Sequence, residues 1–116
     1  MENSLGRSYR LGLYEKALPA ELTWKEKLET ARDSGFDHME ISVDETDEKL
    51  ARLDWTRDQK HELVSLMEET GVPIRSMCLS GHRKYPLGSP NEATRTRGLE
   101  IMDRAVTLAA ELGIRI

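Results

Sequence analysis

The chain has 116 residues, of which 38% are hydrophobic and 33% are charged, and its formal net charge is −4. This length allows one domain with one hydrophobic core, and an acidic balance without long runs of one sign argues against nucleic acid as a partner. The single cysteine excludes an internal disulfide, and the sequence contains neither a signal-peptide core nor an apolar run long enough to cross a membrane. We therefore expect a soluble protein of the cytoplasm that has no membrane partner.

The first predicted element is a strand over residues 9–14, with the sequence YRLGLY. A helix follows it, because Thr23 and Glu26 have the spacing of a capping box, in which each side chain accepts a hydrogen bond from the other residue's backbone N–H. Gly35 then supplies the left-handed residue that commonly ends a helix. Together these signals predict a βα unit over about residues 9–35.

The second unit repeats this order over about residues 36–71. The stretch HMEISV at 38–43 predicts a short apolar strand, and a short helical turn is expected at roughly 46–52. A longer helix then begins at Thr56, which has a Gln three residues later as in a capping box, and ends at Gly71. The repeat of strand, helix and glycine at this spacing is typical of βα units.

The third unit covers about residues 72–113, with a strand at 74–79. Ser89 followed by Pro90 predicts a third capping box with proline at the first helical position, and Gly113 ends the helix. The apolar residues of this helix cover about half of its circumference, which suits packing on a sheet and on neighbouring helices. They are Leu99, Ile101, Met102, Ala105, Val106, Leu108, Ala109 and Leu112.

Alternating strands and helices predict an α/β fold, in which a parallel sheet is joined by right-handed crossovers. The last residues, GIRI, have the pattern of a fourth strand that has only just begun. Parallel sheets need cover on both faces, and so short a strand contributes little pairing. We therefore expect residues 1–116 to be one partial domain, the N-terminal part of a larger protein.

In βα architectures, functional residues gather where strands end and helices begin. Glu15 and Lys16 follow the first strand, residues 44–47 follow the second, and residues 80–85 follow the third. The third loop, SGHRKY, is basic and leads into a helix N-terminus, whose free N–H groups favour anions. It is either a phosphate or carboxylate site or a solvated loop whose charges keep the protein soluble.

Other polar residues have weaker signals. Glu40 lies within a strand and points either into a site or to an ion pair, and the pattern leaves both possibilities open. Three acidic residues after the second strand do not match the spacing of a calcium loop, and we interpret them as a solvated turn: Asp44, Glu45 and Asp47. The remaining candidates are interpreted as structural or packing residues: Trp24, His38, Trp55, His61 and Cys78.

Four longer stretches resemble the L-ribulose-5-phosphate 3-epimerase family, also called L-xylulose-5-phosphate 3-epimerases or hexulose-6-phosphate isomerases. They are LGLYEKALP at 11–19, GFDHMEISVDETDEKLARLDW at 35–55, SMCLSGHRKYPLGS at 76–89 and GLEIMDRAVTLAAELGIRI at 98–116. The resemblance covers nearly the whole chain from residue 9. It implies the fold of the xylose-isomerase-like TIM barrels, of which this chain would be three βα units and the start of a fourth strand.

The resemblance also implies an activity, namely metal-dependent epimerisation at C3 of a ketopentose phosphate in pentose or ascorbate catabolism. In this family a divalent metal ion stabilises an enediolate, and two carboxylates remove and return the proton. The metal ligands lie on later strands, so we expect no catalytic residue, no metal ligand and no bound metal in this chain. The full-length form is expected to be a homo-oligomer.

What the resemblance transfers to this chain is the substrate-binding surface at the top of the barrel. Lys16, His82 and Arg83 are expected to bind substrate oxygens or the phosphate, while Tyr14 and Asp44 shape the pocket. The partner is therefore a phosphorylated ketopentose.

Two alternatives remain open at this point. One is a small doubly wound module of the receiver type, although such a module needs five strands and a cluster of acids after the first. The other is a non-catalytic fragment that acts only by association.

Overall fold

The computed structural model describes residues 6–116. Three strands, β1 (Gly12–Tyr14), β2 (His38–Val43) and β3 (Ile74–Leu79), form one sheet in the order β1-β2-β3. Both strand pairs are parallel, and the register places Tyr14 beside Glu40. The strands therefore follow one another across the sheet in the order of the sequence, as expected for successive βα units.

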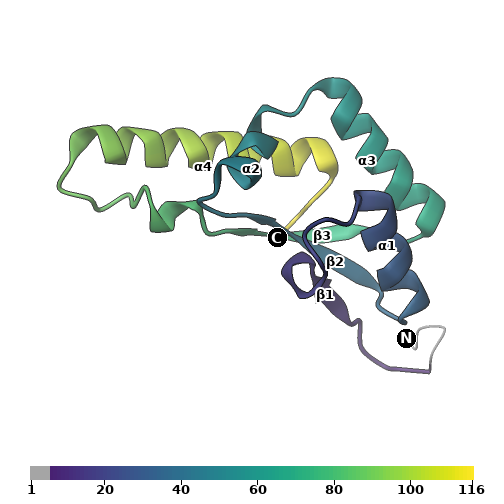
Figure 1. Cartoon of the computed structure of the whole chain (residues 1–116). Helices are drawn as coiled ribbons and strands as arrows, with labels where there is room; N and C mark the ends of the chain where they lie inside the picture. The colour runs from purple at the N-terminus through teal and green to yellow at the C-terminus, as the bar shows by residue number, and fades with distance from the viewer. Residues whose placement is uncertain (1–5) are drawn as a thin grey trace.

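Three longer helices, α1 (Trp24–Asp33), α3 (Arg57–Thr70) and α4 (Glu92–Leu112), lie on the same side of the sheet (Figure 1). Helix α1 packs against α3, and α3 packs against α4. This arrangement is that of barrel units, which wind one way around an axis. A doubly wound module would have helices on both faces, so the receiver-like alternative is wrong. Among the described residues, no helix is long and apolar enough to cross a membrane.

Short helical segments follow the strands. The 3-10 turn η1 (Glu15–Ala17) follows β1, and η3 (Gly81–Arg83) follows β3. After β2 the chain forms α2 (Asp47–Leu50) and then the 3-10 turn η2 (Ala51–Asp54), which confirms the helical turn predicted at roughly 46–52. These segments form the edge of the sheet at which the strands end.

Most of the predicted helix boundaries are confirmed. The capping box at Thr23 and the one at Thr56 are both present with their reciprocal hydrogen bonds. Gly35, Gly71 and Gly113 have φ values of 88°, 72° and 75°, the left-handed conformation that favours glycine.

The third capping box was predicted at the wrong residue. Helix α4 begins at Glu92, and its N-cap is Asn91, whose Oδ1 accepts a hydrogen bond from the Thr94 N–H at 2.9 Å. Asparagine is among the best N-cap residues and lies directly before the helix, whereas the Ser89 hydroxyl accepts a bond from the Asn91 N–H. Pro90 therefore precedes the N-cap rather than occupying the first helical position.

Two strand predictions also need correction. The first strand begins at Gly12 rather than at residue 9, because the Leu11 N–H bonds to the Asp37 carboxylate instead of a neighbouring strand. The last three residues form no strand, although the Met77 N–H donates to the Ile116 carbonyl at 2.8 Å. This single bond places the end of the described chain beside the open edge of β3.

The core lies between the sheet and the helices. Met39, Ile41 and Val43 of β2 are completely buried there. Helix α4 buries only one flank of its predicted apolar face, which consists of Ile101, Ala105, Leu108 and Leu112. The other flank remains exposed and consists of Leu99, Met102 and Val106.

Candidate functional site

The sheet has a polar face on the side away from the helices. Side chains alternate along a strand, so the residues between Met39, Ile41 and Val43 point to the opposite face. Along β2 these are polar, and the register aligns them with polar residues of β3. The face consists of Tyr14, Glu40, Ser42, Ser76 and Cys78.

Hydrogen bonds connect neighbouring residues on this polar face. The Ser76 hydroxyl donates to Glu40 Oε2 at 2.6 Å, which answers the question about Glu40: it lies on the polar face and accepts a hydrogen bond. The Tyr14 hydroxyl bonds to Ser42 Oγ at 3.2 Å. Burial raises the pKa of Tyr14, against a smaller lowering by the bond to Ser42, so its hydroxyl is protonated at neutral pH.

Cys78 was interpreted as a core residue, and this interpretation is wrong. The side chain is half-buried and lies on the polar face, because position 78 is in register with Ser42. Leu79, the next residue, packs against the core instead.

At the end of the sheet, Lys16 and Asp44 form an ion pair with an Nζ–Oδ2 distance of 2.7 Å. Asp44 is 5% exposed, and its Oδ1 also accepts bonds from the backbone N–H and the hydroxyl of Thr46. Burial raises the pKa of Asp44, but the bonds from Lys16 and Thr46 outweigh it and lower that pKa to about 2. The bond to Asp44 in turn raises the pKa of Lys16.

The prediction of a solvated acidic turn is therefore wrong for Asp44, because Lys16 reaches it from the neighbouring loop. Glu45 is half-buried, and its Oε2 is buried without a hydrogen-bond partner. Within residues 6–116, no three His, Cys, Asp or Glu side chains are grouped so that they could hold a metal ion.

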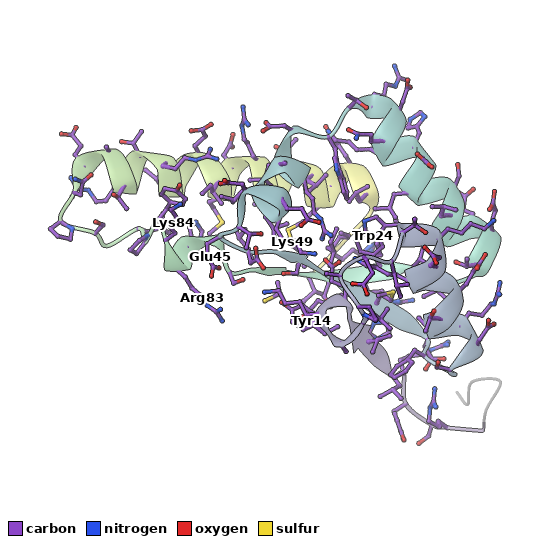
Figure 2. All side chains as sticks on the ribbon, in the orientation of Figure 1. Tyr14, Trp24, Glu45, Lys49, Arg83 and Lys84 are labelled. Atoms are coloured by element: carbon purple, nitrogen blue, oxygen red, sulfur yellow. The ribbon has the colours of Figure 1, made fainter. Side chains whose placement is uncertain are left out.

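The side chains of the basic loop after β3, residues 80–85, point in two directions. His82 Nε2 bonds to the Gly98 carbonyl at 2.9 Å, so Nε2 carries the proton and His82 anchors the loop to α4. Arg83 is exposed and points away from α4, to the side of the sheet on which Tyr14 lies (Figure 2). Lys84 lies on the α4 side, 5.6 Å from the Tyr85 ring centre. The structure thus brings Lys16 and Asp44 together, whereas His82 contacts α4 instead.

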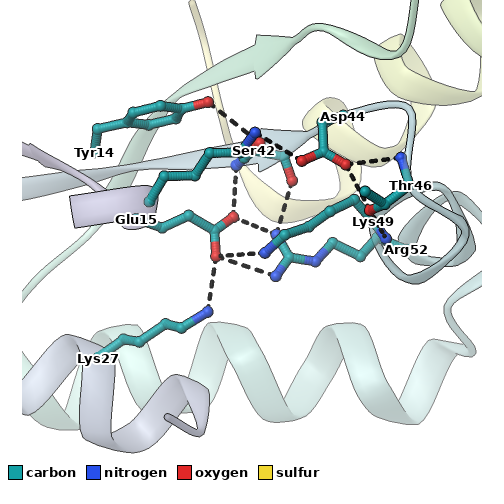
Figure 3. A network of polar contacts seen from close by, with 9 residues as sticks. Tyr14, Glu15, Lys27, Ser42, Asp44, Thr46, Lys49 and Arg52 are labelled. Carbon is teal, nitrogen blue, oxygen red and sulfur yellow. Dashed lines mark hydrogen bonds and ion pairs between the residues drawn. The ribbon is translucent and has the colours of Figure 1, made fainter. Parts of the chain in front are cut away.

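The most heavily bonded side chain at this end of the sheet is Glu15, whose position after the first strand was evident from the sequence but whose partners were not. Glu15 is 2% exposed, and its Oε1 accepts a bond from the Ser42 N–H at 2.6 Å (Figure 3). Its Oε2 lies 2.8 Å from Lys27 Nζ and 3.4 Å from Lys49 Nζ. Arg52 donates to both oxygens. Burial raises the pKa of Glu15, but Arg52, Lys27 and the Ser42 N–H lower it to about 2.

Glu15, Lys27, Lys49 and Arg52 form one cluster, the Glu15 cluster, and two tryptophans lie beside it. The Trp24 ring centre is 4.8 Å from Lys27 Nζ and 5.2 Å from the Arg52 guanidinium carbon, and Trp55 lies 5.7 Å from the same guanidinium. Such contacts are favourable when the cation is desolvated. Trp24 and Trp55 are also packed against the core, which confirms their interpretation as packing residues.

Comparison with known proteins identifies the family. The family described as "Xylose isomerase-like TIM barrel" matches residues 28–116. This chain belongs to that family. A solved structure of D-psicose 3-epimerase in the presence of D-fructose has a TM-score of 0.72, at 16% identity, over 92% of this chain and 35% of that one. At this identity the likeness supports the fold alone.

Relatives within this TIM barrel family carry an enzyme name. The chain is 55% identical over 112 residues to L-ribulose-5-phosphate 3-epimerase UlaE of Salmonella heidelberg (strain SL476). It is 54% identical to the protein of the same name from Escherichia coli O139:H28 (strain E24377A / ETEC). Each alignment covers 97% of this chain and 39% of the relative, so the chain spans about two fifths of the length of these proteins.

In a TIM barrel, the two ends of the sheet have different roles. Barrels of this kind bind ligands at the carboxyl ends of their strands. Lys16, Asp44 and the Glu15 cluster all follow the carboxyl ends of β1 and β2. His38 is the first residue of β2 and therefore lies at the opposite end of the sheet.

Proposed function

We propose that this chain contributes the first three βα units of an enzyme that interconverts L-ribulose 5-phosphate and L-xylulose 5-phosphate. The observation that carries this proposal is 55% identity, over 97% of the chain, to a protein named L-ribulose-5-phosphate 3-epimerase. The polar edge of the sheet supports it, since a sugar phosphate needs hydroxyl partners and cationic groups. We also propose a cytoplasmic location, because a lone cysteine suits a reducing compartment.

Epimerisation at C3 requires the removal of a proton from the carbon next to the carbonyl and its return from the opposite face. A divalent metal ion would stabilise the resulting negative charge. The described residues do not fit a metal site, because they contain no group of three suitable ligands. We therefore assign no proton transfer and no metal ligand to them, and the role that we propose for them is substrate binding.

Within this role, Lys16 and Asp44 would bind sugar hydroxyls as a preformed pair of donor and acceptor. Tyr14 would border the same pocket from the polar face of the sheet, where its hydroxyl already bonds to Ser42. Because its Nε2 donates to Gly98, His82 would offer only its Nδ1 to the substrate. Arg83 is exposed on the side where Tyr14 lies and would offer a planar fork to phosphate oxygens.

The test uses a chimera in which residues 6–116 replace the matching region of the Salmonella epimerase. Arg83→Ala should raise the KM for L-ribulose 5-phosphate by roughly tenfold, because a charge-assisted hydrogen bond is lost. Lys84→Ala is the matched control and should leave KM within about twofold, since Lys84 lies on the α4 side. If Arg83→Ala keeps the KM and kcat of the parent chimera, the basic loop is only a solvated surface.

A further inference from the structure

Arg52 connects three segments at the edge of the sheet at which the strands end. Its Nη1 donates to the Ser42 carbonyl at 2.8 Å, and its two terminal nitrogens donate to the two carboxylate oxygens of Glu15. Ser42 belongs to β2, Glu15 begins the turn η1 after β1, and Arg52 itself belongs to η2 after β2. One guanidinium group therefore holds β2 and the turn that follows the neighbouring strand in a fixed relation.

The contacts of Arg52 are shielded from solvent. Arg52 is 7% exposed, and Ser42 is completely buried. Hydrogen bonds between an arginine and a carboxylate are stronger than those between neutral groups, and exclusion of water strengthens them further. The planar guanidinium group also fixes their direction, whereas a lysine ammonium is a point charge without such a fork. The contact therefore constrains both the distance and the orientation of the Glu15 carboxylate.

Two side chains of the proposed substrate pocket flank this anchored carboxylate, because Glu15 stands between Tyr14 and Lys16 in the sequence. Strand β1 ends at Tyr14, and beyond this residue the Glu15 side chain bonds to β2 by accepting the Ser42 N–H at 2.6 Å. The carboxylate lies within the Glu15 cluster (Figure 3), whereas Lys16 pairs with Asp44 at the end of the sheet. The bond between Glu15 and Arg52 thus sets the position from which Lys16 extends.

Ser42 provides a second connection from Arg52 to the pocket. Its hydroxyl bonds to the Tyr14 hydroxyl at 3.2 Å, while its backbone N–H and C=O are bonded to Glu15 and Arg52. The backbone position of Ser42 is therefore fixed from one side, and its hydroxyl acts on Tyr14 on the other. Arg52 reaches Tyr14 through Ser42 in the same way as it reaches Lys16 through Glu15.

We propose that Arg52 is a positioning residue for substrate binding, which holds the side chains of Tyr14 and Lys16 in place through Ser42 and Glu15. The effect on a sugar phosphate rests on the proposed function, because that function supplies the substrate. The positioning of the two side chains does not rest on it, and it is measured separately.

The positioning is measured by NMR of the 116-residue chain without substrate. In Arg52→Ala the amide resonance of Ser42 should move toward that of an amide without a carboxylate partner, and the resonances of the Tyr14 ring and the Lys16 side chain should shift with it. Leu108→Ala is the control, because Leu108 is a core residue of α4 that is 1% exposed. It should lower the Tm but leave these three resonances unchanged.

The effect on binding is measured with the chimera that contains residues 6–116. Arg52→Ala should raise the KM for L-ribulose 5-phosphate by roughly tenfold and change kcat by less than about twofold, because groups that bind the substrate are displaced. Leu108→Ala should leave KM within about twofold. Free guanidinium ion, well below the concentrations that unfold proteins, should lower the KM of Arg52→Ala toward that of the parent chimera, whereas sodium ion at equal ionic strength should not.

Three results would overturn the proposal: an unchanged KM in Arg52→Ala, an equal rise in Leu108→Ala, or a rise that guanidinium ion does not reverse. The last result would mean that Arg52 supports only the fold. If the parent chimera does not act on L-ribulose 5-phosphate, the proposed function fails, and the NMR result alone decides whether Arg52 positions Tyr14 and Lys16. If the chimera is active but the Tyr14 and Lys16 resonances of Arg52→Ala match those of the wild type, the proposed function stands and the positioning role does not.

Discussion

At the scale of single residues, the side chains of Glu15 and Arg52 make the hydrogen bonds to β2 that a longer β1 would have made. Strand β1 ends at Tyr14, so the backbone of Ser42 has no strand partner on that side. The Glu15 carboxylate accepts the Ser42 N–H, and Arg52 donates to the Ser42 carbonyl at 2.8 Å. Two side chains therefore satisfy the backbone groups of Ser42 that a longer β1 would have paired. These bonds hold Ser42 in place beside Tyr14 on the polar face.

Replacing Glu15 by Gln tests this role through the pH dependence of stability. The pKa of Glu15 is lowered from 4.5 to about 2 by folding, so the unfolded chain binds the proton first as the pH falls. The stability that Glu15 contributes is therefore complete above about pH 4.5 and is lost toward pH 2. Urea unfolding at pH 7 should show a loss of about 3 kcal/mol or more in Glu15→Gln, because three cations lose their carboxylate.

Between pH 4.5 and 2, Glu15→Gln should also lose less stability than the wild type does. The loss of stability that this variant still shows is expected from Asp44, whose pKa is likewise lowered to about 2. Glu29→Gln, on the surface of α1, is the control and should cost less than about 1 kcal/mol at pH 7. An equal cost for the two variants would show that the cluster adds nothing to stability.

Gly98 gives a second prediction at this scale. A Cβ at this position would lie 2.5 Å from the Tyr85 carbonyl oxygen, which is backbone and cannot move without shifting the loop. Gly98→Ala should therefore destabilise the protein by about 1–3 kcal/mol, although alanine favours a helix. Gly88→Ala, with nothing within 4 Å of the added Cβ, should change the free energy of unfolding by less than about 0.5 kcal/mol. Equal values in denaturant unfolding would contradict the close packing of the loop on α4.

The sequence indicated only part of this site. Lys16 and Asp44 were accessible to prediction because polar residues directly after a strand are a local signal. The Glu15 cluster was not, because its cations come from three helical segments and look like ordinary surface charges in the sequence. The burial of Arg52 near two tryptophans is a tertiary property that periodicity does not report.

At the scale of elements, local capping signals predicted two helix starts correctly and misplaced the third. Thr23 and Thr56 each have a Glu or Gln at the third helical position, which completes the reciprocal bonds. Asn91, two residues after Ser89, is also a good capping residue, and its Oδ1 accepts hydrogen bonds from the backbone N–H and the hydroxyl of Thr94. Where two good capping residues stand close together, the pattern alone does not decide between them.

Asn91→Ala should therefore cost about 1 kcal/mol of stability, because it removes the N-cap of α4. Ser89→Ala removes only the bond to the Asn91 N–H, outside the helix, and should cost less than half as much. Denaturant unfolding of the two variants measures the difference. A larger cost for Ser89→Ala would mean that α4 starts where the sequence alone suggested.

At the scale of the whole molecule, the repeat of strand, helix and glycine was enough to predict a parallel sheet with its helices on one side. Alternation of side chains along β2 separates a buried apolar face from a polar one, as a barrel requires. Two features of the described residues suit further barrel units: the exposed apolar flank of α4 and the open edge of β3. A barrel of this type needs about 250 residues.

The purified 116-residue chain should accordingly show no turnover of L-ribulose 5-phosphate, even with a divalent metal ion at stoichiometric concentration. The reason is that its described residues lack a group of three possible metal ligands. A coupled assay for L-xylulose 5-phosphate measures this. Turnover above the background without protein would contradict the substrate-binding role that we assign to these units.

The most direct test of the account is isotope exchange by the chimera in deuterium oxide. The chimera is incubated with L-ribulose 5-phosphate, and the product is analysed by NMR and mass spectrometry. The account predicts L-xylulose 5-phosphate with deuterium at C3, since the proton there is removed and replaced from solvent. A folded chimera that forms no L-xylulose 5-phosphate, or forms it without deuterium at C3, would contradict the account.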